Sequence, residues 1–147
     1  MLVYDPMSNP LNRIEWMFGF LECVHIVSFG IGVGSIALVD FRLLGLGFTN
    51  RPARQIMQDT FLWSLIGLTF AITSGLLLFS TDPQRYAANP SFRFKMIMLI
   101  LATIYNFTIH RKIANAGSGS GASTATAAFS LVSWIAIIFG GLFYAFT

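Results

Sequence analysis

The stretch LECVHIVSFGIGVGSIALVDFRLLGLG, residues 21–47, is apolar enough to lie in lipid, yet it contains Glu22, His25 and Asp40. With the apolar residues before it, this segment exceeds the ~20 residues that a helix needs to cross a bilayer core. An ionisable side chain at the bilayer centre costs at least ~2.5 kcal/mol. We therefore expect the three side chains to face other helices or a cavity.

The composition of the whole chain is typical of an integral membrane protein. Of 147 residues, 55% are hydrophobic and only 10% are charged, whereas a soluble domain has about 25% charged residues. The mean hydropathy is +0.70. The nine basic residues are spread over the ends of several segments, so no nucleic-acid partner is predicted. The single cysteine, Cys23, excludes an internal disulfide.

Four apolar segments predict an all-α fold, an integral membrane four-helix bundle formed by one domain over residues 1–147. A helix satisfies its own backbone hydrogen bonds in lipid, and short connections favour an up-down-up-down order. Asp82-Pro83 and Asn89-Pro90 are turn and helix-start signals in one connection. The Gly/Ser-rich run NAGSGSGASTATA is expected to be a flexible connection. The predicted helices span about residues 14–46, 60–80, 91–113 and 124–146.

The expected location is a lipid bilayer, the inner (cytoplasmic) membrane of a bacterium, which the chain crosses several times. The basic residues divide almost evenly between the two ends of the predicted bundle. The positive-inside rule places the richer end in the cytoplasm, so we expect both termini on the opposite side. Four basic residues lie at the end with the termini and five at the other: Arg13, Arg85, Arg93 and Lys95, against Arg42, Arg51, Arg54, Arg111 and Lys112.

Helical geometry gathers the polar residues into stripes on the first and third helices. At 100° per residue, Glu22 and Asp40 fall at the same angle of the first helix. Lys95, Asn106 and His110 share one face of the third helix, which runs in the same direction. Their depths pair Glu22 with Lys95, and Asp40 with His110, so that each buried charge has a partner. In this interpretation the polar residues are structural and fix the register of the helices.

His25 supports a second, functional interpretation. A transmembrane histidine can ligate haem iron through its neutral imidazole, while a neighbouring carboxylate orients the ring. Arg93 and Lys95 would then be available for the haem propionates. His110 lies about 13 Å deeper along its own helix at a rise of 1.5 Å per residue, so the two histidines are not expected to share one haem. We predict His25, Arg93 and Lys95 as a candidate haem b site, with no other metal site and no catalytic residue.

Two runs, VHIVSFGIGVGSIALVDFRLLG and SGLLLFSTDPQRYAANPSFRFKMIMLILATIYNFTIH, resemble an uncharacterised bacterial family of four-helix membrane proteins, a domain of unknown function. VDFRLLG and NPSFRFK are the most specific pieces of this resemblance. The placing of histidines, lysine and arginine-leucine is distantly similar to HemJ-type protoporphyrinogen oxidases, which bind b-type haem, and to CopD-type copper-resistance proteins. The HemJ-type resemblance implies that His25 is a haem ligand and that Lys95 is functionally important. Asp40 before the arginine departs from that pattern.

Three functions of different class remain open at this stage. The first is a haem- or redox-associated membrane subunit. The second is a non-catalytic accessory subunit that packs against other subunits of a respiratory or photosynthetic complex, or against a second copy; Gly30-x-x-x-Gly34 is a small-residue motif that permits such close approach. The third is a small transporter component that uses the Glu22–Asp40 stripe as a polar path. An independent catalytic activity is not expected.

Overall fold

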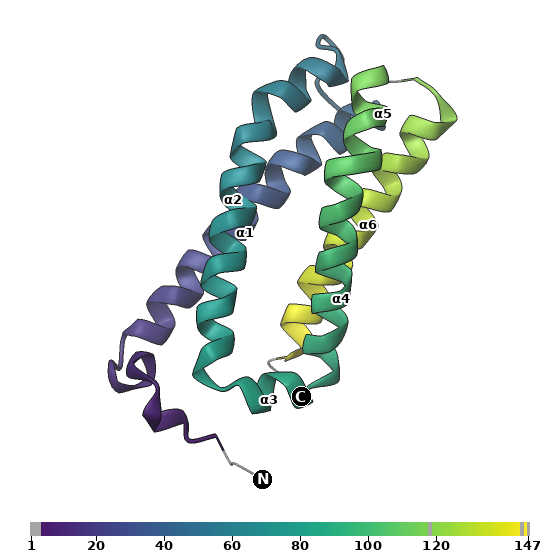
Figure 1. Ribbon diagram of the computed structural model, residues 1–147. Helices are drawn as coiled ribbons and strands as arrows, with labels where there is room; N and C mark the ends of the chain where they lie inside the picture. Colours follow the sequence, from purple (N-terminus) through teal and green to yellow (C-terminus); the bar gives the residue numbers. More distant parts are fainter. Residues whose placement is uncertain (1–3, 118, 145, 147) are drawn as a thin grey trace.

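Four long helices that alternate in direction make up most of the molecule (Figure 1). The computed structural model describes residues 4–117, 119–144 and 146, and within these residues no strand occurs. Four helical spans in this part of the chain are long and apolar enough to cross a membrane. The prediction of an all-α, multi-pass membrane bundle is confirmed. The spans are α1 (Met17–Leu43), α2 (Ala53–Thr81), Pro90–Ala116 and α6 (Gly121–Tyr144).

The third span is divided into three consecutive helical pieces. These are α4 (Pro90–Tyr105), a π-helical segment η3 (Asn106–His110) and α5 (Arg111–Ala116). Three short helical elements lie outside the four spans. They are the 3-10 turns η1 (Pro6–Ser8) and η2 (Pro10–Arg13), which precede α1, and the helix α3 (Pro83–Ala88), which lies between α2 and α4. The sequence carries no signal that predicts the π-helical segment.

The helices differ from the predicted ranges mainly at their polar ends. α2 begins directly after Pro52, at Ala53, rather than at about residue 60. Its first turn buries Ala53, Ile56 and Met57 in the core, so this polar-looking stretch has an apolar face to pack. Similarly, α6 begins at Gly121, and most of the Gly/Ser-rich run is helical rather than a connection. Hydropathy finds the part of a helix that lies in lipid and misses turns that extend beyond it.

The connection between the second and third spans uses both signals that the sequence contains. The Asp82 side chain accepts a hydrogen bond from the Arg85 backbone N–H at 3.2 Å and caps α3. The Asn89 side chain accepts from the backbone N–H groups of Ser91 and Phe92 at 2.9 and 3.2 Å and caps α4. Each cap is followed by proline at the first helical position, where a missing N–H costs nothing.

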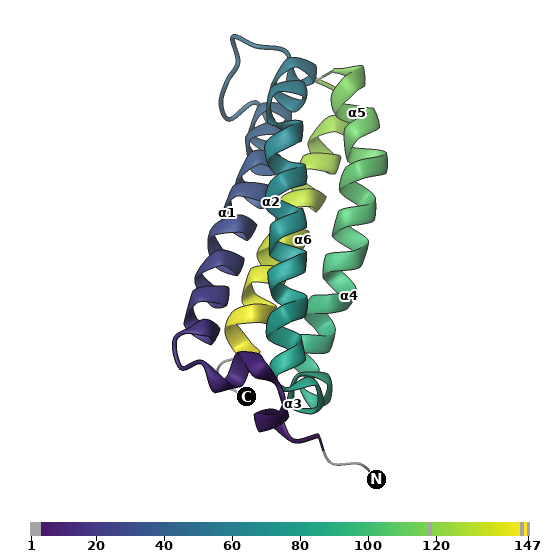
Figure 2. The same ribbon diagram turned by 60° about the vertical axis from the view of Figure 1, so that its left-hand side comes forward.

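The helices pack as two pairs, α1 with α2 and α4 with α6 (Figures 1 and 2). The first pair crosses closely at Gly32 and Gly67, where a Cβ added to Gly32 would lie 2.8 Å from the Leu68 backbone nitrogen. The pairs meet where Phe29 of α1 packs edge-to-face on Trp134 of α6, with ring centroids 6.1 Å apart. Two apolar clusters form the core: Val39, Leu43, Ala53, Ile56, Met57, Ala114 and Ala127, and Ile36, Leu68, Ala102, Trp134 and Ile137.

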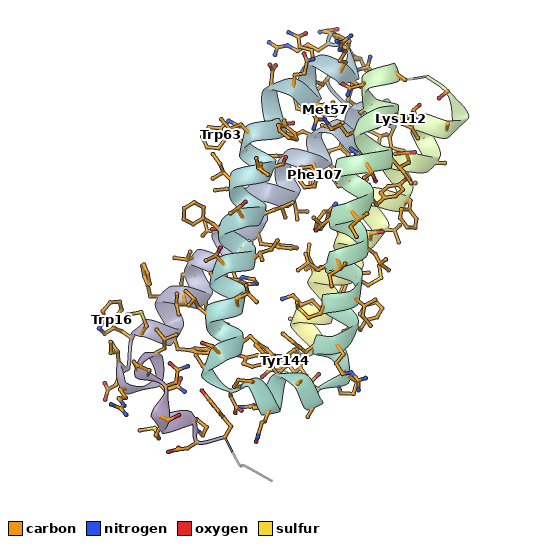
Figure 3. All side chains as sticks on the ribbon, in the orientation of Figure 1. Trp16, Met57, Trp63, Phe107, Lys112 and Tyr144 are labelled. Carbon is orange, nitrogen blue, oxygen red and sulfur yellow. The ribbon has the colours of Figure 1, made fainter. Side chains whose placement is uncertain are left out.

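The two ends of the bundle differ in how closely the pairs approach. We call the end with the α1–α2 and α5–α6 connections the connection end, and the opposite end the terminal end. α5 packs on α2 near the connection end, whereas α4 packs mainly on α6. Within α4 only Ala102, near its C-terminus, is buried. Met57 and Lys112 mark the connection end in Figure 3, and Tyr144 marks the terminal end.

The outer faces of all four spans are apolar and exposed. They present large side chains such as Phe70 on α2, Ile97 on α4 and Val132 on α6, each about 60% exposed. A water-soluble monomer rarely exposes so much contiguous apolar surface. These faces fit a lipid bilayer, in which they would contact acyl chains.

Candidate functional site: a closed polar network and an open histidine

A buried polar network joins three of the four spans near the connection end. Nε2 of His110 in η3 lies 2.6 Å from Oδ1 of Asp40 in α1. The Ser130 hydroxyl of α6 donates to Oδ2 of the same carboxylate at 2.7 Å. Asp40 is fully buried, and the other two side chains are almost so. The structure thus brings together the two residues, Asp40 and His110, that the sequence analysis paired.

The network satisfies both oxygens of a carboxylate that is removed from solvent. Because an ionised carboxylate only accepts hydrogen bonds, Nε2 of His110 carries the proton that lies between the two groups. This arrangement is not a nucleophilic triad, since Ser130 and His110 both contact the aspartate and the serine does not contact the histidine. A paired and hydrogen-bonded charge is the form in which a buried carboxylate is tolerated.

His25 lies in the other half of α1 and is held quite differently. Its Nδ1 lies 2.8 Å from the backbone carbonyl oxygen of Ala71 in α2 and 3.3 Å from the Ser74 hydroxyl oxygen. Phe29, one turn along α1, stacks on the imidazole with the ring planes at 27°. Gly75 makes room for the ring, since a Cβ there would lie 3.0 Å from Cε1 of His25.

These contacts define which ring nitrogen of His25 is free. A backbone carbonyl can only accept, so Nδ1 must donate its proton to Ala71. The Ser74 hydroxyl already donates to the Phe70 carbonyl at 2.7 Å, which leaves its oxygen to accept from Nδ1 as well. In the neutral imidazole Nε2 is then unprotonated, and it makes no hydrogen bond within the described residues. A half-buried histidine is thereby oriented with one free lone pair.

The other two residues of the predicted haem site, Lys95 and Arg93, differ in burial and in their contacts. Lys95 of α4 is half-buried and lies along Gly140 and Gly141 of α6; a Cβ added to Gly141 would lie 3.3 Å from its Nζ. Lys95 is close enough to His25 to interact with it electrostatically. Arg93 is exposed on the same helix. Lys95 forms no ion pair or hydrogen bond with the described part of the chain.

The predicted Glu22–Lys95 pair is not formed. Glu22 is exposed, and the ion pairs among the described residues are Arg51–Asp59 and His110–Asp40. The reason is packing: Glu22 lies on a part of α1 that no neighbouring helix covers, while α4, which carries Lys95, packs mainly on α6. The Glu22–Asp40 stripe is therefore not one continuous buried polar surface, although the two residues share a helix angle.

The third helix keeps part of its predicted stripe. Asn106 and His110 are buried, as are Ala102 and Ala114 at the same spacing.

Gly30 and Gly34 of α1 do not form the predicted close contact within this chain. Neither has an atom within 4 Å of an added Cβ, and the close α1–α2 contact uses Gly32 instead. The sequence analysis also did not identify Ser130. One serine among several in an apolar helix does not indicate which residue it will contact.

Within the described chain, no group of three or more His, Cys, Asp and Glu side chains is placed to hold a metal ion. Cys23 is exposed and unpaired by disulfide. A ligand of iron in this structure would therefore be a single imidazole in a largely apolar setting, and His25 Nε2 is the atom that is free for this role.

Comparisons with known proteins identify the family and no more. No match was found among curated proteins or among solved structures. A family model described as a family of unknown function, DUF6644, matches residues 14–147. This match confirms the resemblance to an uncharacterised family, while the similarity to HemJ-type and CopD-type proteins stays a prediction. The chain belongs to the DUF6644 family of unknown function.

Proposed function

We propose that this protein is a haem- or redox-associated subunit of a bacterial inner-membrane system, and that His25 ligates the iron of a b-type haem. The observation that carries the proposal is the orientation of the His25 ring. Its Nδ1 is fixed on the Ala71 carbonyl oxygen at 2.8 Å, which leaves Nε2 unprotonated and free. Metal-ligating histidines commonly donate their other ring nitrogen to a backbone carbonyl or carboxylate in this way.

The surroundings of His25 suit a large apolar ligand with acidic substituents. The ring lies beside Phe29 and Gly75, and the adjoining half of α4 buries no residue before Ala102. Lys95, which has no hydrogen bond or ion pair among the described residues, would be available to one propionate, and the exposed Arg93 to the other. A bound haem would supply one-electron chemistry, which the side chains of this chain do not provide. The protein's part is to fix the imidazole and to exclude water around it.

One axial ligand is all that the histidines of this chain can supply. His110 is occupied by Asp40 at 2.6 Å and lies toward the opposite end of the bundle. Any further ligand would come from another side chain, from a partner subunit or from a small molecule. The spectrum of a haem held by His25 would then respond to added small ligands.

Packing as an accessory subunit is a second candidate function. It is favoured by Gly30 and Gly34, whose added Cβ atoms would meet nothing within 4 Å and whose helix face is thus open to a close partner. Small residues of this kind permit backbones of neighbouring transmembrane helices to approach. This candidate requires no cofactor and becomes the favoured one if the first is disproved.

An absorbance spectrum of the purified protein in detergent tests the haem proposal. The spectrum is recorded after haem supplementation, oxidised and then reduced with dithionite. We expect a Soret band in the wild-type protein and its loss in His25→Ala. Added free imidazole should restore the band in His25→Ala, because it replaces the missing ligand without covalent attachment.

The matched control is His110→Gln, which keeps a hydrogen-bond donor for Asp40 and removes the other imidazole. Its spectrum should equal that of the wild type, and Lys95→Leu should retain the band but lose haem more readily on dilution. A folded, colourless wild-type protein, or an unchanged Soret band in His25→Ala, would overturn the proposal.

A further inference from the structure

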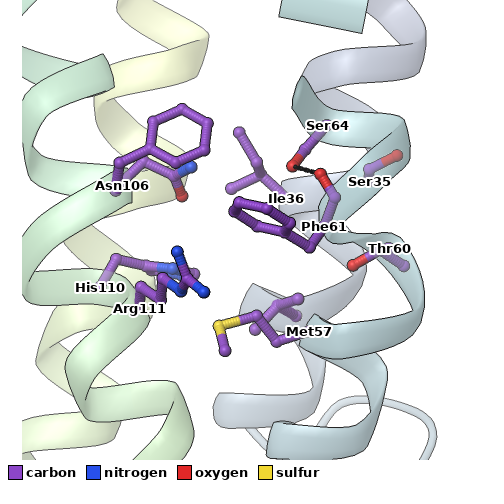
Figure 4. Close-up of a pocket in the computed structure, with 11 residues that line it drawn as sticks. Ser35, Ile36, Met57, Thr60, Phe61, Ser64, Asn106, His110 and Arg111 are labelled. Atoms are coloured by element: carbon purple, nitrogen blue, oxygen red, sulfur yellow. Dashed lines mark hydrogen bonds between the residues drawn. The ribbon is translucent and has the colours of Figure 1, made fainter. Parts of the chain in front are cut away.

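A small cavity lined by both polar and apolar side chains lies beside the His110–Asp40 pair, away from the His25 site. Its volume is about 20 Å³, which is enough to hold a water molecule. Figure 4 shows Asn106, His110 and Arg111 facing Ser64, Phe61 and Met57 across it. The cavity is bounded by α1, α2 and the π-helical segment. π-helical insertions of this kind are frequent at functional sites.

Asn106 is the residue that marks the cavity as a site. Its side chain is only 7% exposed, and its amide has no hydrogen-bond partner in the described chain. Among the described residues, the fully buried side-chain atom without a partner is Oγ1 of Thr103, whereas the polar atoms of Asn106 keep access to the space beside them. The amide lines the cavity, and a water there would give it both a donor and an acceptor.

The opposite wall supplies acceptors for the same water. The hydroxyl groups of Ser35, Thr60 and Ser64 each donate to a backbone carbonyl of their own helix, at 2.7, 2.9 and 2.8 Å. Their protons are therefore occupied, while lone pairs on their oxygens stay available. A water in the cavity can donate to one of these oxygens and accept from the Asn106 amide.

His110 faces the cavity with one nitrogen uncommitted. Its Nε2 is bound to Asp40, whereas Nδ1 makes no hydrogen bond within the described residues. A hydronium ion at the cavity can transfer a proton to Nδ1: one O–H bond breaks, one N–H bond forms, and water remains. The positive charge then lies on the imidazolium, next to the carboxylate that it already contacts.

A route from the cavity leads to the connection end. The cavity and an open bowl of about 460 Å³ share the residues Met57, Phe61 and Arg111. The Arg111 guanidinium lies over the Phe61 ring at 4.4 Å, and both residues line the two spaces. The bowl is lined on its outer side by Arg54, Gln58 and Asn115. A movement of the exposed Arg111 side chain would join cavity and bowl.

We propose that this cavity is a hydrated proton-exchange site, in which water bound by Asn106 delivers protons to His110 from the connection end past Arg111 and Phe61. The charged groups that face His110 are few. Asp40 faces it from α1 and Arg111 lies next to it in α5; among the described residues, α2 and α6 place uncharged side chains such as Ser64 and Ser130 there, and Arg54 of α2 lines only the bowl. The inference is independent of haem binding at His25.

Nitrogen-15 NMR of histidine-labelled protein in lipid nanodiscs tests the proposal. The chain has two histidines, so a single His25→Gln variant assigns both sets of signals. We expect the ring N–H signal of His110 to disappear on transfer to D2O, because its proton exchanges with water in the cavity. A ring N–H signal of His110 that persists in D2O would overturn the proposal.

Filling the cavity tests where the protons enter. Asn106→Leu should preserve the ring N–H signal of His110 in D2O, and Thr108→Val, an exposed change in the same segment, should leave its exchange as in the wild type. The His25 signals report whether each variant is folded, and Ser64→Val replaces Asn106→Leu if the latter does not fold. Exchange of His110 as in the wild type in a folded, cavity-filled variant would contradict the proposed route.

Discussion

The two histidines of this protein lie in opposite halves of one bundle and are held by opposite ring nitrogens. His110 is buried at the connection end and donates from Nε2 to the Asp40 carboxylate at 2.6 Å. His25 is half-buried toward the terminal end and donates from Nδ1 to the Ala71 carbonyl at 2.8 Å. The first has a charged partner, and the second has only uncharged ones, the Ala71 carbonyl and the Ser74 hydroxyl.

This difference follows from how the helix pairs meet. Near the connection end α1, η3 and α6 converge, and a carboxylate enclosed there must have all its hydrogen bonds satisfied. Toward the terminal end α4 packs mainly on α6, with Phe92 also stacked on Phe79 of α2, and within the described residues neither Glu22 nor Lys95 forms an ion pair. A polar group that is not enclosed needs no partner in the chain and stays available to a ligand. The closed end therefore supports stability, and the open end is the better candidate for binding.

The largest effect is expected when the closed network loses its carboxylate. Asp40→Ala would leave His110 and Ser130 without their shared partner and should lower the free energy of unfolding by about 3–5 kcal/mol. Glu22→Ala, at the open end of the same helix, should change it by less than about 0.5 kcal/mol. Unfolding by SDS in mixed micelles measures both. Equal decreases in the free energy of unfolding of the two variants would contradict the proposed difference between the connection end and the terminal end.

A smaller effect is expected at the crossing of α1 and α2, between the two ends. In Gly32→Ala the new Cβ would lie 2.8 Å from the Leu68 backbone nitrogen, and such overpacking costs about 1–3 kcal/mol. Gly34→Ala, two residues along, adds a methyl group to open space and should be neutral or slightly stabilising. The same unfolding assay compares them. An unchanged free energy of unfolding in Gly32→Ala would mean that α1 and α2 do not pack this closely.

The smallest effect concerns a packed corner of the otherwise open terminal end. Tyr86 of α3 stacks on Tyr144 with ring centroids 4.9 Å apart, and burial, followed by the nearby Tyr144, raises its pKa to about 12. Since the unfolded chain ionises first, the stabilisation is complete below about pH 10 and is lost as the pH approaches 12. Tyr86 is half-exposed, so the loss should be about 1 kcal/mol.

Unfolding measured near pH 9 and near pH 11 tests this prediction, with Tyr86→Phe as the control. The control keeps the ring contacts but cannot ionise, so its stability should fall less over that range than that of the wild type. An identical alkaline loss in both proteins would show that Tyr86 is not responsible.

Much of this fold can be predicted from the sequence because hydropathy and helical period are local properties. The four spans and the Asp40–His110 pairing follow from them. The helix caps formed by Asp82 and Asn89, each followed by proline, are likewise local, because each side chain accepts a hydrogen bond from a backbone N–H two or three residues away. The start of α2 at Ala53 is less evident, because its first turn gains its apolar contacts only from α1, α5 and α6.

The site is less predictable because it depends on contacts between distant segments. Helix angle places Glu22 with Asp40, but only the divergence of the helix pairs decides that one is exposed and the other buried. The roles of Ser130 and of the Ala71 carbonyl require the packing of α6 and α2 on α1. The π-helical segment has no sequence signal, yet it contains both Asn106 and His110.

The most direct test of the contrast between the ends is the tautomeric state of the two imidazoles. Nitrogen-15 spectra of histidine-labelled wild-type protein at neutral pH, without added haem, report which ring nitrogen carries the proton. The structure predicts opposite answers: a proton on Nδ1 with a bare Nε2 for His25, and a proton on Nε2 for His110. The same tautomer for both residues, or averaged signals typical of a mobile, solvated ring at His25, would contradict it.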